Sequence, residues 1–266
     1  MLPRVNEGQP ENRSSPKNRT LDAVREPATP RARRAQRAIS VDSPVVSTLK
    51  PAAVLWDMDG TIIDSEPYWM RAETILMAQF GVEWSHELGL TMVGQGLSTS
   101  AGILQANGVD MPADDIIEFL STMVMEQIAD NVPWRPGARE LLEDVRESGV
   151  PNALVTMSFR RMADLVVSSV GFDAFSAVVS GDEVSQPKPH PEAYRRAAEL
   201  LNVTIADCVA IEDSVPGLAS AMASGAVSIG VPHMSLLPDI AGYTLWPTLA
   251  DRTARDISAV FEGARS

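Results

Sequence analysis

The chain has 266 residues, of which 45% are apolar, and its 35 acidic and 22 basic side chains give a formal charge of −13 at pH 7. A single cysteine, Cys208, excludes an intramolecular disulfide framework and a multi-cysteine zinc site, and three histidines argue against a histidine-built metal site. The acidic balance argues against nucleic acid or an anionic membrane as a partner, because both would repel the protein.

The first 50 residues differ in composition from the rest. They carry ten Lys and Arg against five Asp and Glu, with six prolines and no apolar periodicity. We predict a disordered basic tail over residues 1–50, because such a segment buries too little apolar surface to offset the entropy of ordering. A targeting segment and a nucleic-acid arm are weaker interpretations. Since no later run predicts a membrane span, we expect a cytoplasmic protein, and we expect it to be a monomer.

Short apolar runs alternate with amphipathic helical patterns over most of the remaining chain. The runs predict five buried strands, at 52–56, 153–156, 177–180, 208–211 and 227–231. Amphipathic helical patterns lie between these runs, at 137–148, 159–170, 191–201 and 215–223. This alternation predicts an α/β fold with a doubly wound parallel sheet covered by helices on both faces.

One segment breaks the alternation. Residues 66–136 contain no convincing strand, and three amphipathic patterns predict helices at 67–80, 98–107 and 112–131. We therefore predict an all-helical cap domain over 66–136, inserted into a core domain made of 51–65 and 137–266.

Polar residues follow four of the predicted strands, and the carboxyl ends of parallel strands meet at one edge of a sheet. In chain order they are Asp57 and Asp59, then Thr156 and Ser158, then Lys188, then Glu212 and Asp213. Such a group of carboxylates is costly unless a cation lies between them. Oxygen ligands without His or Cys suit Mg²⁺, so we predict a magnesium site of Asp57, Asp59, Glu212 and Asp213.

The positions of these residues also suggest roles. Asp57 directly follows a strand and is best placed as a rigidly held nucleophile, while Asp59 could donate a proton to a leaving oxygen and later accept one from water. Gly60 allows the backbone to pass close to the site. Lys188 is the only lysine after Lys50 and could neutralise Asp57 and phosphate oxygens; the alternative is a chance surface lysine.

These residues, in this order, resemble the four motifs of the haloacid dehalogenase (HAD) superfamily. The string DGTIIDSEP over 59–67, and IEDS over 211–214 with Gly217, Ala221 and Gly225 behind it, resemble the β-phosphoglucomutase-like phosphatase subfamily. That subfamily has a helical cap between its first two motifs, where this chain has its helical insert. The resemblance covers about residues 52–250.

The resemblance implies a reaction at a phosphate ester. It implies that Asp57 attacks phosphorus and becomes an aspartyl phosphate, and that Asp59 is the general acid and then the base. Thr156 would bind a phosphoryl oxygen and Lys188 would balance charge. The groups implied to hold Mg²⁺ are Asp57, the backbone carbonyl of Asp59, Asp213 and, directly or through water, Glu212.

Some positions depart from the subfamily. Met157 follows Thr156 where relatives often have Asn, which removes a polar contact. Trp69 stands where the mutases of the subfamily have a His, and the stretch 94–98 lacks the Arg of their specificity loop. Both departures favour hydrolysis over mutase action.

The predicted substrate-binding residues are Gly60, Glu66, Trp69, Met157 and Ser158. Glu66 either binds sugar hydroxyls or is a favourable acid at a helix N-terminus, and Trp69 either packs inside the cap or forms a platform for the ligand. We therefore expect a Mg²⁺-dependent phosphatase of small phosphate monoesters, with sugar or polyol phosphates preferred. The alternatives are a phosphosugar mutase and a non-catalytic protein that binds phosphorylated metabolites.

Overall fold

The structure is a computed structural model that describes residues 49–266. The predicted tail over 1–50 therefore lies outside the described residues, except for its last two.

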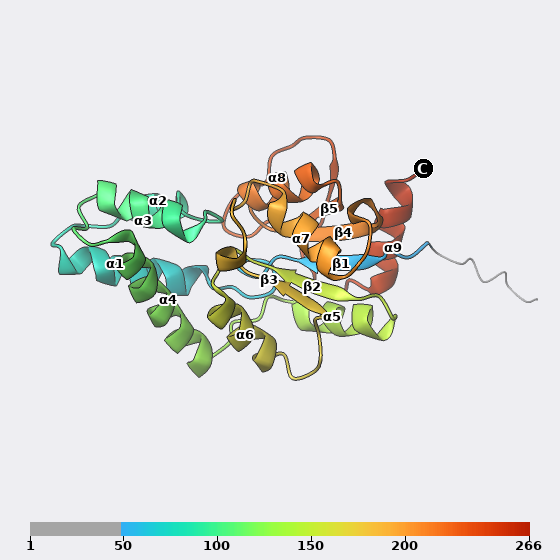
Figure 1. The fold of residues 1–266 in the computed structure, drawn as a ribbon, viewed down its shortest axis with the longest axis horizontal. Helices are drawn as coiled ribbons and strands as arrows, with labels where there is room; N and C mark the ends of the chain where they lie inside the picture. Colours follow the sequence, from blue (N-terminus) through green and yellow to red (C-terminus); the bar gives the residue numbers. More distant parts are fainter. Residues whose placement is uncertain (1–48) are drawn as a thin grey trace, which may run out of the picture. The chain divides into compact units, whose positions relative to one another are not determined.

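A six-stranded parallel sheet forms the centre of the described chain, in the order β3-β2-β1-β4-β5-β6 (Figure 1). Its strands are β1 (Ala53–Trp56), β2 (Asn152–Val155), β3 (Ala177–Val179), β4 (Cys208–Glu212), β5 (Val227–Gly230) and β6 (Tyr243–Leu245). The chain runs from β1 outward through β2 and β3 on one side, and from β4 outward through β5 and β6 on the other. Ligands bind such sheets in the crevice where the strand order reverses, which here lies between the ends of β1 and β4.

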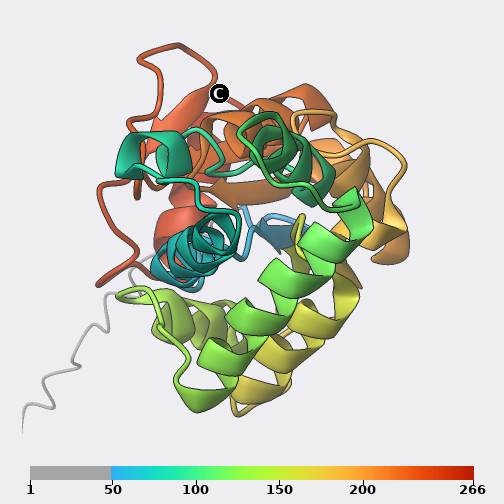
Figure 2. The same cartoon turned by 90° about the vertical axis from the view of Figure 1, so that its left-hand side faces the viewer.

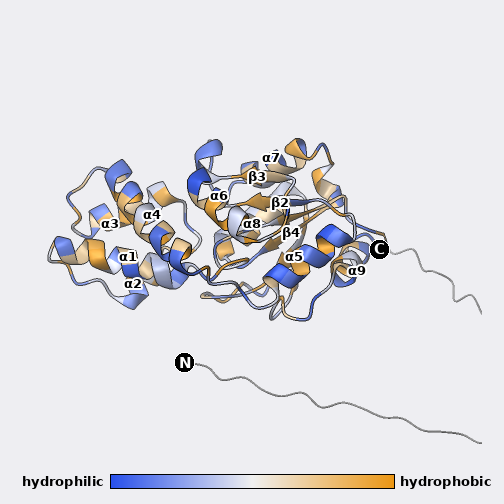
Figure 3. Ribbon diagram, turned by 90° about the horizontal axis from the view of Figure 1, so that it is seen from below, coloured by the Kyte–Doolittle hydropathy of each residue, from blue (hydrophilic) through white to orange (hydrophobic). Residues whose placement is uncertain are grey.

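Helices cover both faces of the sheet, so the predicted α/β class is confirmed. One face packs against α7 (Glu192–Leu200) and α8 (Val215–Ser224), and the other against α5 (Ala138–Glu147), α6 (Arg160–Ser169) and α9 (Ala254–Gly263). Strand β1 contributes to both faces, because successive side chains of a strand point to opposite sides of the sheet. Ala53 and Leu55 lie in the apolar cluster on the α7 and α8 side, and Val54 and Trp56 lie in the cluster on the α5, α6 and α9 side. Figure 3 shows alternating blue and orange residues along α5, as expected for a helix with one buried face.

Between β1 and α5 the chain forms four helices, which we call the helical segment. They are α1 (Glu66–Gln79), α2 (His86–Leu90), α3 (Leu97–Ala106) and α4 (Ala113–Asp130). Helix α4 packs against both α1 and α3. It buries one stripe at four-residue spacing, made of Ile116, Leu120, Val124 and Ile128.

Two chain crossings join the helical segment to the sheet, and they hydrogen-bond to each other. The Asp64 amide donates to the Pro133 carbonyl at 2.7 Å, and the Arg135 amide donates to the Ile62 carbonyl at 2.9 Å. Helix α4 also lies beside α6 (Figure 2), where Arg161 forms a bidentate ion pair with Glu118, with N–O distances of 2.8 and 2.6 Å. The described residues 49–266 contain no helix with the length and apolarity needed to cross a bilayer.

Candidate active site

The ends of β1, β2 and β4 bring the predicted site residues to one edge of the sheet. Asp57 follows β1, Thr156 follows β2, and Asp213 follows Glu212 at the end of β4. The parallel ladder fixes their spacing, because the Asp57 amide donates to the Ile211 carbonyl at 3.0 Å and continues the β1–β4 pairing. All four side chains are buried, and so is Lys188.

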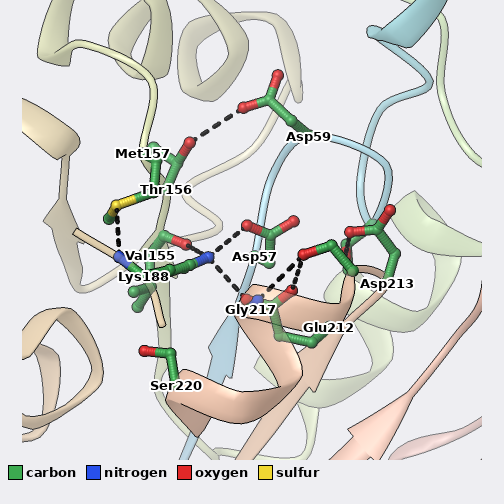
Figure 4. A network of polar contacts seen from close by, with 12 residues as sticks. Asp57, Asp59, Val155, Thr156, Met157, Lys188, Glu212, Asp213, Gly217 and Ser220 are labelled. Carbon is green, nitrogen blue, oxygen red and sulfur yellow. Dashed lines mark hydrogen bonds and ion pairs between the residues drawn. The ribbon is translucent and has the colours of Figure 1, made fainter. Parts of the chain in front are cut away.

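Lys188 lies between two carboxylates in this buried site (Figure 4). Its Nζ is 2.6 Å from Asp57 Oδ1 and 2.7 Å from Glu212 Oε1, and it donates to the Val155 carbonyl at 3.0 Å. Burial lowers the pKa of Lys188, but Asp57 and Glu212 raise it more, so the net shift is upward and the ammonium stays charged. The lysine that the sequence singled out is therefore part of the site and not of the surface.

Asp57, Glu212 and Asp213 form a cluster with one carboxylate oxygen each within 4.8 Å of the others. Burial, followed by Glu212, raises the pKa of Asp57, and burial, followed by Asp57, raises the pKa of Asp213. Asp57 Oδ2 is buried and has no hydrogen-bond partner among the described residues. One lysine does not balance three carboxylates, whereas a divalent cation between them would, and a donor set of oxygens alone suits Mg²⁺.

Gly60 closes the site from the backbone side. Its φ is +86°, and a Cβ at this position would lie 2.1 Å from Asp213 Oδ2. Only glycine allows the loop after β1 to pass the acidic cluster at this distance.

The Asp59 carboxylate lies apart from this cluster and is held by hydroxyl groups. Its Oδ1 accepts from Ser65 Oγ at 2.6 Å, and its Oδ2 accepts from Ser158 Oγ at 2.8 Å and Thr156 Oγ1 at 3.1 Å. The carboxylate is thus oriented from both sides, and only the backbone carbonyl of Asp59 is left as a candidate metal ligand.

A cavity of about 70 Å³ lies over these residues, between the sheet edge and the helical segment. Its floor consists of Asp57, Asp59, Met157, Ser158, Lys188 and Ser214. Its roof comes from the helical segment: Glu66, Trp69 and Glu73 of α1, with Met92, Gly94, Gln95, Leu97, Ser100 and Leu120. Thr156 is fully buried and does not line this cavity.

Two predicted substrate residues make further contacts around this cavity. Trp69 is half-buried, lines the cavity and donates from Nε1 to Asp59 Oδ1 at 3.4 Å, so it both packs and faces the site. Met157 Sδ accepts a hydrogen bond from the Lys188 amide at 3.3 Å.

Two residues of this site were not predicted from the sequence. Tyr194 of α7 is fully buried, and its hydroxyl donates to Glu212 Oε1 at 2.6 Å while its ring lies 5.2 Å from Lys188 Nζ. Glu73 lines the roof seven residues after Glu66. Each lies in a predicted helix, but nothing local distinguishes them from packing or surface residues.

A model of the haloacid dehalogenase-like hydrolase family matches residues 51–225. The chain belongs to this family. Hexitol phosphatase B of Escherichia coli K12 is 32% identical over 215 residues, which cover 77% of this chain and 96% of that relative. The phosphorylated carbohydrates phosphatase of Thermotoga maritima is 30% identical over 187 residues, covering 68% and 85% of the two chains.

The fold is also similar to that of a solved structure. CbbY from Rhodobacter sphaeroides, in complex with xylulose-1,5-bisphosphate, matches with a TM-score of 0.68 and 26% identity, over 76% of this chain and 96% of that chain. The HAD family resemblance given by the sequence motifs is therefore confirmed.

Proposed function

We propose that this protein is a Mg²⁺-dependent phosphatase that hydrolyses small phosphate monoesters of sugars or polyols through an aspartyl-phosphate intermediate. The observation that carries the proposal is the buried Asp57 Oδ2, which has no partner among the described residues while Oδ1 is fixed by Lys188. A carboxylate oxygen held in this way is a positioned nucleophile. The relatives that are named as phosphatases of hexitols and phosphorylated carbohydrates support the substrate class.

The first half of the reaction would transfer the phosphoryl group to Asp57. Oδ2 of Asp57 would attack phosphorus while the bond from phosphorus to the ester oxygen breaks. The leaving oxygen would take the proton of the Asp59 carboxyl, which Ser65, Ser158 and Thr156 hold in place.

The second half would regenerate the enzyme. Water would attack phosphorus, its proton would go to the Asp59 carboxylate, and the bond between phosphorus and Asp57 would break to release inorganic phosphate. Lys188 would keep its charge through both steps and offset the charge on Asp57 and the phosphoryl oxygens.

Asp57, Asp213, Glu212 and the backbone carbonyl of Asp59 would hold the magnesium ion. When bound, this ion would supply positive charge to the phosphoryl oxygens and to the acidic cluster. Tyr194 and Lys188 both contact Glu212 Oε1, and they orient its carboxylate.

We also propose that residues 66–136 act as a cap that opens over a core of 51–65 and 137–266. A cavity of about 70 Å³ is smaller than the sites that hold whole organic ligands, which occupy roughly 300 Å³ or more. The helical segment must therefore move away from the sheet edge to admit a sugar phosphate. The two chain crossings near Asp64 and Pro133 join it covalently to the sheet, so the bending would occur there.

The test is phosphate release from a panel of hexitol and hexose phosphates, with Mg²⁺ and with EDTA. We expect release with Mg²⁺, loss of release with EDTA, and recovery when Mg²⁺ is returned. The variant Asp64→Asn, which alters an acid next to the site without touching the cluster, is the matched control for Asp57→Asn. Folded protein that releases no phosphate from any ester would overturn the proposal.

A further inference from the structure

Helix α1 places two buried acids and an aromatic ring on the roof of the cavity. Glu66, Trp69 and Glu73 are spaced by three and four residues, which puts them on one face of the helix. Glu66 is 7% exposed and Glu73 is 4% exposed. Acids are rarely buried to this extent without a partner.

Both acids line the cavity, and neither forms an ion pair with a described residue. Among the described residues, no group donates a hydrogen bond to the Glu66 carboxyl, and the Glu73 carboxyl accepts one, from Trp84 Nε1 at 3.2 Å. Burial, followed by Asp59, raises the pKa of Glu66 to about 8, and burial raises the pKa of Glu73 to about 7. Carboxyl groups that line a cavity can form further hydrogen bonds with a ligand, and hydroxyl groups are suitable partners.

Acidic groups outnumber basic groups around the cavity. Its walls carry the four carboxyl groups of Asp57, Asp59, Glu66 and Glu73 against the single ammonium of Lys188, which is already paired with Asp57 and Glu212. The segment 66–136 has ten acidic residues and only two basic ones, Arg71 and Arg135, and neither lines the cavity. The roof thus offers no cation to a second anionic group.

Resting on the proposed phosphatase function, we propose that Glu66 and Glu73 bind hydroxyl groups of the alcohol part of the substrate and exclude esters whose alcohol part carries a second anion. Hydroxyl groups donate well to carboxylates and accept from carboxylic acids, so both protonation states of the two residues can bind them. Above pH 8 both acids are ionised, and a second phosphate or carboxylate about 5 Å from one of them would then lower the productive affinity roughly a hundredfold. This separates the chain from CbbY, whose structure was solved with a bisphosphate.

Three esters on one carbon skeleton test the inference. They are a hexitol 6-phosphate, the hexonic acid 6-phosphate that differs by a terminal carboxylate, and the hexitol 1,6-bisphosphate. At pH 9, where Glu66 and Glu73 are both ionised, we expect kcat/KM to be highest for the hexitol 6-phosphate and to fall about a hundredfold for each of the others. Equal kcat/KM for the three esters would overturn the inference and leave the phosphatase proposal standing, whereas no phosphate from any ester would overturn the proposed function itself.

Two isosteric variants locate the selectivity. In Glu73→Gln the amide oxygen can still accept from Trp84, so the change removes charge and keeps shape. At pH 9 we expect the preference for the hexitol ester over the hexonic acid ester to narrow about tenfold in Glu66→Gln and in Glu73→Gln, because each change removes one carboxylate that is ionised at this pH. The control is Glu83→Gln, at an exposed acid that does not line the cavity, and it should keep the wild-type ratio. An unchanged ratio in both cavity variants would overturn the inference, and if neither folds, the three esters on the wild-type protein decide.

Discussion

The floor and the roof of the cavity differ in whether their carboxylates are paired with a positive charge. On the floor, Lys188 contacts Asp57 and Glu212, and Asp57 can share a cation with Glu212 and Asp213, which do not line the cavity themselves. On the roof, Glu66 and Glu73 are both buried, and the one hydrogen bond that either carboxyl accepts from a described residue is the bond from Trp84 to Glu73. The floor therefore suits one fixed chemical group, which in the proposed function is the phosphate. The roof has those of a site completed by the remainder of the ligand, so changes to the two parts should have separable effects.

The largest effect should come from the floor, with Asp57→Asn. The amide is a poor nucleophile, so phosphate release should fall by about a thousandfold or more while the folded structure remains. Steady-state phosphate release and a thermal melt together check this. A variant that keeps a tenth of the activity or more would contradict the role of Asp57 as nucleophile.

Lys188→Met should combine loss of activity with loss of stability. The change leaves Asp57 and Glu212 buried without their cation, and breaking a buried ion pair in this way costs about 3–5 kcal/mol of unfolding free energy. Urea denaturation measures it, with Lys50→Met as the control, because Lys50 is exposed and its Nζ contacts only the Ser148 carbonyl among the described residues. Equal unfolding free energies for the two variants would show that the two carboxylates do not need the lysine.

On the roof, Glu73 should make stability depend on pH. Its pKa is raised from 4.5 to about 7 by burial, so the folded state binds the proton more tightly than the unfolded state does. The associated stability is complete below pH 4.5 and is lost as pH rises through 7, with a maximum effect of ~3 kcal/mol. Glu73→Gln should therefore flatten the fall in melting temperature between pH 5 and pH 8, measured in EDTA.

The matched control for this pH experiment is Glu83→Gln, which should follow the wild-type curve. A Glu73→Gln curve parallel to that of the wild type would mean that the Glu73 carboxyl titrates normally in the folded protein.

The smallest effect should come from the exposed contact between the two parts. Arg161 and Glu118 join α6 to α4, and a double-mutant cycle on this pair should give a coupling of about 0.5 kcal/mol that falls with added salt. The pair between Arg160 and Asp164 is the control, because it lies within α6 alone. A salt-independent coupling would contradict the electrostatic origin of the contact.

The strands of the sheet were predictable because their signal is local. The runs that became β1, β2 and β4 are buried along their whole length, and polar residues such as Asp57 and the Glu212–Asp213 pair mark where they end. Strand β6 was not predicted, since it has three residues at the edge of the sheet and they are half-buried or exposed, so it shows no apolar run. Helix α9 was also missed, although Thr253 and Asp256 form a capping box that marks its start.

The partners of the site residues were harder to predict than the residues themselves. Tyr194 and Glu73 lie in helices that the sequence predicts, but which helical face meets the site depends on how α7 and α1 pack. That packing is set by long-range contacts, such as those of α1 with α4, which leave no local pattern in the sequence. The motifs therefore predicted the polar residues of the floor. That two acids face the cavity from the roof could be seen only in the structure.

The solitary position of Lys188 has a practical consequence. The chain has three lysines, and the other two, Lys17 and Lys50, lie within its first 50 residues. Amines react with acylating reagents only when uncharged and accessible, and Lys188 is neither while it is paired with Asp57 and Glu212. Acylating labels and amine-coupled supports should thus attach near the start of the chain and leave the body from residue 51 onward unmodified, so that the immobilised protein keeps its site free.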